Sequence, residues 1–396
     1  MHEDDGIAVS CCDGPMRIIL LCRSLEVGGA ERQIVELAKG LSRRGHEVSV
    51  AVFYDGGPLT SELDRAGIRI HALRKAGRWD VLGFWLRLVR LVRRERPDIV
   101  HSYLTVPNLL AASIRPLLPR CAIVWGIRAS RIDARHYNWL FDWVERIAVR
   151  LSKHADRIIV NSHAGFGDHR QMGYPVSVMR VVENGIDTDR FVPDRPRGLE
   201  LRERWGVLPN ETLIGVVGRL DPMKGHRTFF EAASPIAEDR PEVRFVCVGS
   251  GNPAFAEVLR DAAGRSLGAR IIWQDVMSDP TPAYNALDGL CSASEFGEGF
   301  SNVIAEAMSC GVPCVATDIG DSARIVGHPG YIAAPADACS LRRALVALLD
   351  DLRMQNVDRT ALRRRIVESY SLERLVLRTE EILSEALRLR QERGSR

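Results

Sequence analysis

The stretch R-I-I-L-L-C-R-S-L-E-V-G-G-A-E-R-Q-I-V-E-L-A-K-G-L-S-R-R, residues 17–44, indicates the fold of this chain. An apolar run, Arg17–Cys22, precedes a turn with two glycines, and apolar residues then recur every three or four positions. The run predicts a buried strand, and the recurrence predicts an amphipathic helix that ends at Gly45. Similar pairs of strand and helix follow along the chain, which predicts parallel sheets built from βαβ units.

These units fall into two series, and the second begins with the apolar run at residues 213–220. The segment between the series, residues 183–198, is rich in Pro, Gly and Asp, which is typical of a linker. We therefore expect an α/β protein with two Rossmann-like domains that face each other across a cleft. The expected parts are a disordered extension (1–15), an N-terminal Rossmann-like domain (16–185), a linker (186–198), a C-terminal Rossmann-like domain (199–370) and a C-terminal helix (371–396) that packs back on the N-terminal domain.

Composition narrows the class of protein. The chain has 396 residues, of which 46% are hydrophobic, and a net charge of +3, which gives no reason to expect nucleic acid as a partner. The nine cysteines lack disulfide-framework or zinc-finger spacing, which favours a reduced, cytoplasmic location. The first fifteen residues do not have a secretory pattern, and no uncharged apolar run is long enough to span a bilayer.

Two loops that follow strands are candidates for phosphate binding. Gly28 and Gly29 open the first helix, where the backbone can approach an anion closely, although a plain turn would look the same. In V-G-R-L-D-P-M-K-G-H, residues 217–226, Arg219 and Lys224 can converge on a diphosphate. The alternative for this second loop is a solvated basic segment.

The segment E-G-F-S-N-V-I-A-E, residues 298–306, places two carboxylates eight positions apart. Glu298 lies in a glycine-rich turn, and Glu306 lies in a helix expected over residues 302–309. Backbone N–H groups at the start of a helix lack helical partners and can bind sugar hydroxyls or phosphate oxygens. The residues that offer these groups are Gly299, Phe300, Ser301 and Asn302. The alternative is two surface acids on an ordinary helix.

Taken together, these motifs closely resemble those of retaining glycosyltransferases of family 4, which have the two-domain GT-B fold. The chain carries G-G-A-E-R, N-G-I-D, G-R-L-D-P-M-K-G and E-F-G-E-G-F-S-N-V-I-A-E in the order of the family. The resemblance extends from about residue 16 to about residue 382.

The resemblance implies a hexosyltransferase that uses a UDP-, GDP- or ADP-sugar and needs neither a cofactor nor a metal. Arg219 and Lys224 would stabilise the leaving nucleoside diphosphate. Glu298 would bind the donor sugar, and Glu306 would bind the ribose. Further donor contacts would come from the N-terminal glycines and from the turn before the helix, namely Gly28, Gly29, Gly299, Phe300, Ser301 and Asn302. The loop at residues 248–252 resembles the family's loop under the base, and Asn184 of N-G-I-D is expected to be structural.

One position departs from the family. Many members carry a T-x-H segment whose histidine lies near the reacting sugar, and Arg128 takes that place in A-I-V-W-G-I-R. A guanidinium cannot act as a base, but it can hold an anion. His101 and His136 are nearby in the sequence, although a lone histidine is more often structural. The W-G-I-R-A-S variant resembles that of bacterial exopolysaccharide and lipopolysaccharide transferases, whose acceptor is a glycan or a lipid-linked glycan.

Two further patterns have plain alternatives. Asp187 and Asp189 form a nominal D-x-D in the linker, but such acidic triplets arise by chance and we expect no metal there. Residues 78–96 form a basic amphipathic segment that can make weak contact with an anionic membrane, which would place the protein at the inner face of the cytoplasmic membrane. The alternative, which we favour for its apolar side, is packing on the sheet. Other readings of the whole chain are a sugar-nucleotide epimerase and a non-catalytic nucleotide-sugar binding module.

Overall fold

The computed structural model describes residues 14–26, 28–77, 79–128 and 139–394, with the side chains of residues 139–142 and 394 excepted. The described chain forms two compact units. Unit 1 comprises the residues up to 126 together with residues 150–159 and 376–396, and unit 2 comprises residues 127–149 and 160–375. The unit boundaries therefore differ from the domain boundaries expected at residues 185 and 370.

The first sheet has seven strands in the order β3-β2-β1-β4-β5-β6-β7. The pairs β1–β2, β2–β3, β1–β4 and β4–β5 are parallel. The strands are β1 (Arg17–Cys22), β2 (Glu47–Val52), β3 (Arg69–Ala72), β4 (Ile99–Tyr103), β5 (Ala122–Ile127), β6 (Arg157–Val160) and β7 (Met179–Val181). The order reverses beside β1, which is the switch point where ligands bind in such folds.

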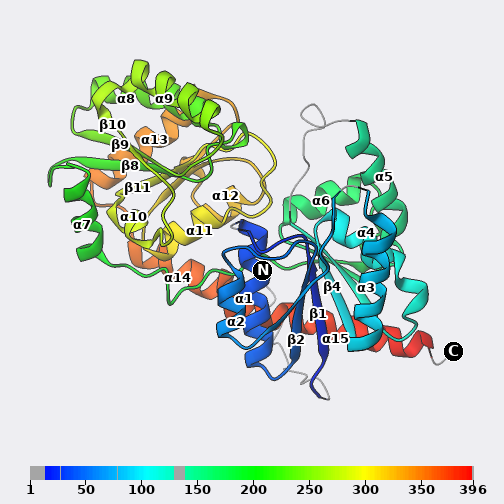
Figure 1. The fold of residues 1–396 in the computed structure, drawn as a ribbon. Coiled ribbons are helices and arrows are strands. Elements are labelled where there is room, and N and C mark those ends of the chain that lie inside the picture. Colours follow the sequence, from blue (N-terminus) through cyan, green and yellow to red (C-terminus); the bar gives the residue numbers. More distant parts are fainter. Residues whose placement is uncertain (1–13, 27, 78, 129–138, 395–396) are drawn as a thin grey trace. The chain divides into compact units, whose positions relative to one another are not determined.

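The helices associated with this sheet are α1 (Gly29–Arg43), α2 (Thr60–Arg65), α3 (Val81–Glu95), α4 (Thr105–Ser113), α5 (Trp139–Ser152) and α6 (His163–Gln171). Figure 1 shows α1 and α2 on one face of the sheet and α3 and α4 on the other. Helix α1 forms because its apolar residues, Ile34, Val35, Leu37 and Leu41 among them, share one buried side.

The C-terminal helix α15 (Leu372–Gly394) contacts α1 within unit 1. A Cβ added at Gly40 would lie 2.2 Å from a methyl carbon of Val376, so the absence of a side chain allows the close approach. The Glu380 carboxylate lies 2.8 Å from Nε2 of His46, in the turn after α1, and also pairs with Arg44. These contacts attach α15 to unit 1.

Helix α3 packs only part of its apolar surface. Leu88, Val89 and Val92 are buried, as expected for a helix on a sheet. Packing on the sheet was favoured for the apolar side of residues 78–96, but Val81 and Leu82, in the first turn, are 62% and 70% exposed. The expectation is therefore wrong for the first turn of this helix.

The second sheet lies in unit 2 and has six strands in the order β10-β9-β8-β11-β12-β13. Its neighbouring strands are paired in parallel. The strands are β8 (Thr212–Val217), β9 (Val243–Val248), β10 (Ile271–Gln274), β11 (Gly289–Ser292), β12 (Cys314–Thr317) and β13 (Ile332–Ala333). The switch point here lies between β8 and β11, whose carboxyl ends carry the two charged motifs.

Helices cover both faces of this second sheet (Figure 1). They are α7 (Arg195–Arg204), α8 (His226–Asp239), α9 (Pro253–Leu267), α10 (Thr281–Ala286), α11 (Asn302–Ser309), α12 (Ser322–Val326), α13 (Ala338–Arg353) and α14 (Arg359–Tyr370). The core between the layers is apolar and includes the fully buried rings of Phe229, Phe245 and Tyr284. The expected α/β architecture with two parallel sheets is confirmed. None of the described helices combines the length and the apolar character needed to cross a membrane.

Candidate functional site

The loop after β8 turns sharply into α8 and carries Lys224. Asp221 begins the turn, because its Oδ1 accepts the Met223 N–H at 3.0 Å and so caps a short 3-10 helix, η4 (Pro222–Lys224). Gly225 follows with a φ of +62°, and a Cβ there would lie 1.9 Å from the carbonyl oxygen of Ala293. Only glycine fits this position, so the close approach of the loop to the segment after β11 depends on it.

Lys224 and Glu298 meet at the carboxyl ends of β8 and β11. The Lys224 ammonium pairs with Oε1 of Glu298, and the Ser294 hydroxyl donates to the same oxygen at 3.0 Å. The Lys224 side chain is 20% exposed and that of Glu298 is 11% exposed, so the pair is shielded but reachable from solvent. Two of the three residues assigned to catalysis from the sequence therefore lie in direct contact.

Further contacts clamp the lysine loop to the glutamate loop. The Glu295 N–H donates to the Met223 carbonyl at 2.8 Å, and the Glu295 carboxylate accepts from the Thr228 hydroxyl at 2.6 Å. A Cβ at Gly297, where φ is +76°, would lie 2.7 Å from the Met223 sulfur. The clamp holds the two loops that carry the ion pair in one arrangement.

Arg219 lies on the same loop but does not join that pair. Its Nε lies 3.3 Å from an Asp221 oxygen, and its side chain is 66% exposed. The guanidinium is therefore accessible to an anionic ligand, while its contact with Asp221 is weak because it is exposed to water.

The turn before α11 is tightly held. Phe300 is buried with its ring edge-on to Tyr370 at a centroid distance of 5.3 Å, and Ser301 is buried at the helix N-cap. The Ser301 side chain makes no capping hydrogen bond, so it does not satisfy the amides of the first turn of α11. Gly299 accepts the Asp321 N–H at 2.8 Å, and a Cβ on Gly299 would lie 2.7 Å from Oδ1 of Asn161.

Glu306 lies one turn into α11 and is held by a buried phenol. The Tyr284 hydroxyl donates to Oε2 of Glu306 at 2.6 Å. Burial, followed by the charge of Glu306 and this hydrogen bond, raises the pKa of Tyr284 well above its usual value. The phenol therefore stays protonated and keeps donating to the carboxylate.

The loop over residues 248–252 packs against the Arg219 loop. A Cβ at Gly249 would lie 1.9 Å from the Gly218 carbonyl oxygen, and the Leu220 N–H donates to the Ser250 carbonyl at 2.9 Å. Gly218 and Gly249 thus bring together the loops that follow the adjacent strands β8 and β9. The family resemblance implies that the nucleotide base lies over the second of these loops.

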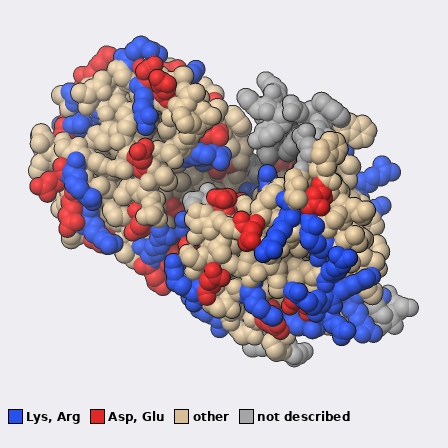
Figure 2. Space-filling view, viewed as in Figure 1, with Lys and Arg blue, Asp and Glu red and all other residues tan. Residues whose placement is uncertain are grey.

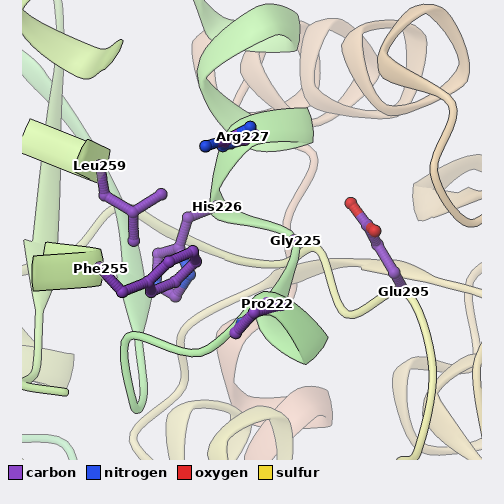
Figure 3. Close-up of a pocket in the computed structure, with 7 residues that line it drawn as sticks. All are labelled: Pro222, Gly225, His226, Arg227, Phe255, Leu259 and Glu295. Atoms are coloured by element: carbon purple, nitrogen blue, oxygen red, sulfur yellow. The ribbon is translucent and has the colours of Figure 1, made fainter. Parts of the chain in front are cut away.

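A cavity of about 300 Å³ lies beside the lysine loop (Figure 3). It is lined by Pro222, Gly225, His226, Arg227, Phe255, Leu259 and Glu295. His226 is 3% exposed, and its Nδ1 has no hydrogen-bond partner among the described residues. Burial, aided by the nearby Lys224 charge, lowers the pKa of His226 to about 4.

The sequence did not single out Thr228, Glu295, Tyr284 or His226. The only available signal was their position: His226 and Glu295 stand at the ends of quoted motifs, Thr228 lies two residues beyond one, and Tyr284 lies on the helix that precedes β11. None of the four carries a motif of its own.

Arg128, in unit 2, reaches α11 through Asn184. Its Nη1 donates to Oδ1 of Asn184 at 3.2 Å, and the Asn184 amide donates to Oδ1 of Asn302 at 2.9 Å. Asn184 was expected to be structural, and the contacts place it between Arg128 and the first residue of α11.

The remaining candidates lie in unit 1 or outside the described residues. In unit 1, His101 is buried in β4, with its Nδ1 3.1 Å from the Val124 carbonyl oxygen, so it fits the structural alternative. Also in unit 1, Gly28 has an extended backbone and precedes Gly29, the first residue of α1. His136 lies outside the described residues.

The nominal D-x-D is a local turn. Oδ1 of Asp187 accepts the N–H groups of Asp189 and Arg190 at 3.2 and 3.0 Å. Within the part of the chain that the structure describes, no group of three His, Cys, Asp or Glu side chains is placed to hold a metal ion.

Two family models match the chain, and together they cover most of it. The model described as "Glycosyltransferase Family 4" matches residues 27–190, and that described as "Glycosyl transferases group 1" matches residues 211–351.

Similar proteins include two bacterial enzymes that match most of this chain. The N-acetyl-alpha-D-glucosaminyl L-malate synthase of Bacillus anthracis is 22% identical, over 91% of this chain and 95% of that protein. The UDP-Gal:alpha-D-GlcNAc-diphosphoundecaprenol alpha-1,3-galactosyltransferase of Escherichia coli is 25% identical, over 80% of this chain and 84% of that protein.

Among solved structures, Anabaena HepE in complex with UDP is similar to this chain, with a TM-score of 0.82 and 23% identity over 93% of this chain and all of that one. HepE in complex with UDP-glucose gives a TM-score of 0.81, at 23% identity over 93% of this chain and 99% of that one. These likenesses show the fold. With the two family models, they show that the chain belongs to the group 1, family 4 glycosyltransferases of the GT-B fold.

Proposed function

We propose that this chain is a retaining hexosyltransferase that moves a hexose from a nucleotide diphosphate sugar to a hydroxyl of a glycan or lipid-linked acceptor. The observation that carries the proposal is the Lys224–Glu298 pair, which lies close in sequence to the uncapped start of α11. It puts positive charge and a carboxylate at the switch point of the second sheet, which suits a ligand with phosphates and hydroxyls. The galactosyltransferase relative and the HepE complex with UDP-glucose support a donor of this class.

In the proposed reaction, Lys224 stabilises the charge that develops on the leaving diphosphate. An ammonium group has three N–H donors, so Lys224 can keep its contact with Glu298 while it binds a phosphate oxygen. Arg219, which is exposed on the same loop, would add a second cation. We propose that these two cations act where other transferases use a metal ion, and that no cofactor is needed.

The bond changes balance without an enzymatic base. The bond between the anomeric carbon and the diphosphate oxygen breaks, and the acceptor oxygen bonds to the same face of that carbon. The acceptor proton passes to a leaving phosphate oxygen. In this scheme Arg128 need not replace a histidine base, and its contact with Asn184 supports a role in holding α11.

The donor residues take separate roles in this proposal. Glu298 would bind the hexose, and Glu306, held by Tyr284, would bind the ribose hydroxyls. The backbone of residues 299–302 would complete the sugar pocket. A lipid-linked acceptor would bring the protein to the inner face of the cytoplasmic membrane.

A thermal-shift screen against UDP-, GDP- and ADP-sugars tests donor binding, because a ligand that binds the folded state raises the melting temperature. Transfer is then measured with the stabilising donor, and NMR of the product reports the anomeric configuration. Retention of configuration and loss of transfer in Glu298→Ala are expected. Inversion would refute the mechanism, and an isomerised sugar nucleotide formed without acceptor would replace the proposal by an epimerase. Binding with no transfer across an acceptor panel would indicate a non-catalytic module.

A further inference from the structure

One side of α3 exposes apolar residues followed by arginines. Trp79, just before the helix, is 89% exposed, and Leu82 and Leu86 are 70% and 38% exposed. Arg90 and Arg93 follow at spacings of four and three and are also exposed. Residues three or four apart lie on the same side of a helix, so these five side chains form one stripe, which we call the α3 stripe.

The two arginines of the stripe are not neutralised by acidic residues around them. Arg90 and Arg93 make no ion pair with any described residue, and Arg94 pairs with Glu95 while its side chain remains 69% exposed. Arg87, by contrast, is held by Asp80. Figure 2 shows Lys and Arg side chains gathered over the part of unit 1 where Figure 1 places α3.

We propose that the α3 stripe docks unit 1 on a membrane surface that contains anionic lipid. Clustered arginines are attracted to an anionic surface, and a tryptophan next to exposed leucines suits the boundary between head groups and acyl chains. The stripe runs along the helix, so both ends reach the surface when the helix lies flat on it.

Other occupants fit the stripe less well. Three exposed apolar side chains offer far less area than a stable protein interface, which buries roughly 800 Å² on each partner. The net charge of the whole chain is only +3, so attraction to an anionic partner has to come from a local cluster of arginines such as this one.

The experiment measures co-sedimentation of the full chain with vesicles of phosphatidylcholine alone and of phosphatidylcholine with 30% phosphatidylglycerol. Each arginine near an anionic surface is worth about a fivefold change in partitioning, so Arg90→Gln and Arg93→Gln together are expected to weaken binding by about 25-fold. The matched control, Arg343→Gln with Arg353→Gln, removes the same charge from exposed sites on unit 2 and is expected to change binding little.

The apolar end of the stripe is tested by Trp79→Ser with Leu82→Gln, which is expected to weaken binding about tenfold. Leu208→Gln with Met354→Gln, at residues 57% and 66% exposed on unit 2, is the control. Equal binding to both vesicle types, or equal losses in the stripe and control variants, would overturn the proposal. A concentration-dependent dimer that Leu82→Gln abolishes would assign the stripe to a second copy instead.

The reason that we give for membrane docking, access to a lipid-linked acceptor, rests on the proposed function. The docking itself does not. Vesicle binding is measured without donor or acceptor, so it can succeed while transfer fails. The reverse case is a stripe variant that no longer binds vesicles but keeps transfer to a water-soluble acceptor, so the two proposals can fail separately.

Discussion

Replacing Lys224 by alanine tests the proposed site most directly. Loss of the cation that stabilises the leaving group is expected to lower transfer by about 100-fold to 1,000-fold, as removal of one electrostatic contact does at other active sites. The variant also leaves Glu298 shielded without its cation. An exposed ion pair contributes about 0.2–1 kcal/mol to the free energy of unfolding, and breaking a buried pair costs about 3–5 kcal/mol. The Lys224 and Glu298 side chains are 20% and 11% exposed, between these cases, so we expect a loss of about 2 kcal/mol.

The stability change is small enough to be separated from the loss of activity. A change of about 2 kcal/mol corresponds to a fall in Tm of about 4–8 °C for a unit of this size. Transfer is assayed at 25 °C with the nucleotide sugar that gives the largest thermal shift, after circular dichroism has shown that the variant is folded.

Lys39 provides a matched control in unit 1. Its ammonium lies 2.7 Å from Glu36 and 2.9 Å from Glu62, and its side chain is 24% exposed, much like that of Lys224. Lys39→Ala is expected to lower Tm by a similar amount and to leave transfer unchanged. If Lys224→Ala keeps transfer within about threefold of the unmodified protein, or if Lys39→Ala loses as much activity, the assigned role of Lys224 is refuted.

Three further predictions concern the loops and the carboxylates around this pair. Gly225→Ala places a Cβ 1.9 Å from the Ala293 carbonyl oxygen at a φ of +62°. The free energy of unfolding, measured by chemical denaturation, is expected to fall by more than about 1 kcal/mol, and transfer is expected to fall as well. Tyr284→Phe removes the hydrogen bond that holds Glu306. The apparent affinity for UDP, measured by calorimetry, is therefore expected to fall about tenfold. Burial lowers the pKa of His226 to about 4, so the unfolded state binds more protons than the folded state below about pH 6.5. The free energy of unfolding is therefore expected to fall by about 3 kcal/mol between about pH 6.5 and pH 4. His226→Gln cannot titrate, and its free energy of unfolding, measured by chemical denaturation, should depend less on pH.

Local structure followed the sequence closely where periodicity was strong. The first strand was expected at Arg17–Cys22 and the helix after Ser301 at residues 302–309, and both have those bounds. The strand expected over residues 213–220 instead ends at Val217, because Gly218 takes a φ of +155° and turns the chain. Hydrophobic pattern reports burial, but it does not report where a glycine changes the backbone direction.

The contacts of the site were much less predictable than its residues. Lys224 and Glu298 are 74 positions apart, and the sequence assigned each to catalysis without indicating that they touch. Their contact depends on Gly225 and Gly297, which let two loops approach to van der Waals distance or closer. Thr228 and Glu295 went unnoticed because a hydroxyl and a carboxylate have no signature until the fold brings them to 2.6 Å.

The structure also sharpens what the two glutamates of the donor motif can do. A general acid must have a proton to give, but Glu298 accepts from an ammonium and a hydroxyl, and Glu306 accepts from a phenol whose pKa is raised. Both carboxylates are therefore hydrogen-bond acceptors toward the protein groups around them, and in the proposed reaction they position ligand hydroxyls. The proposed reaction therefore assigns neither of them, nor Arg128, to the proton released by the acceptor, which leaves on an oxygen of the departing phosphate.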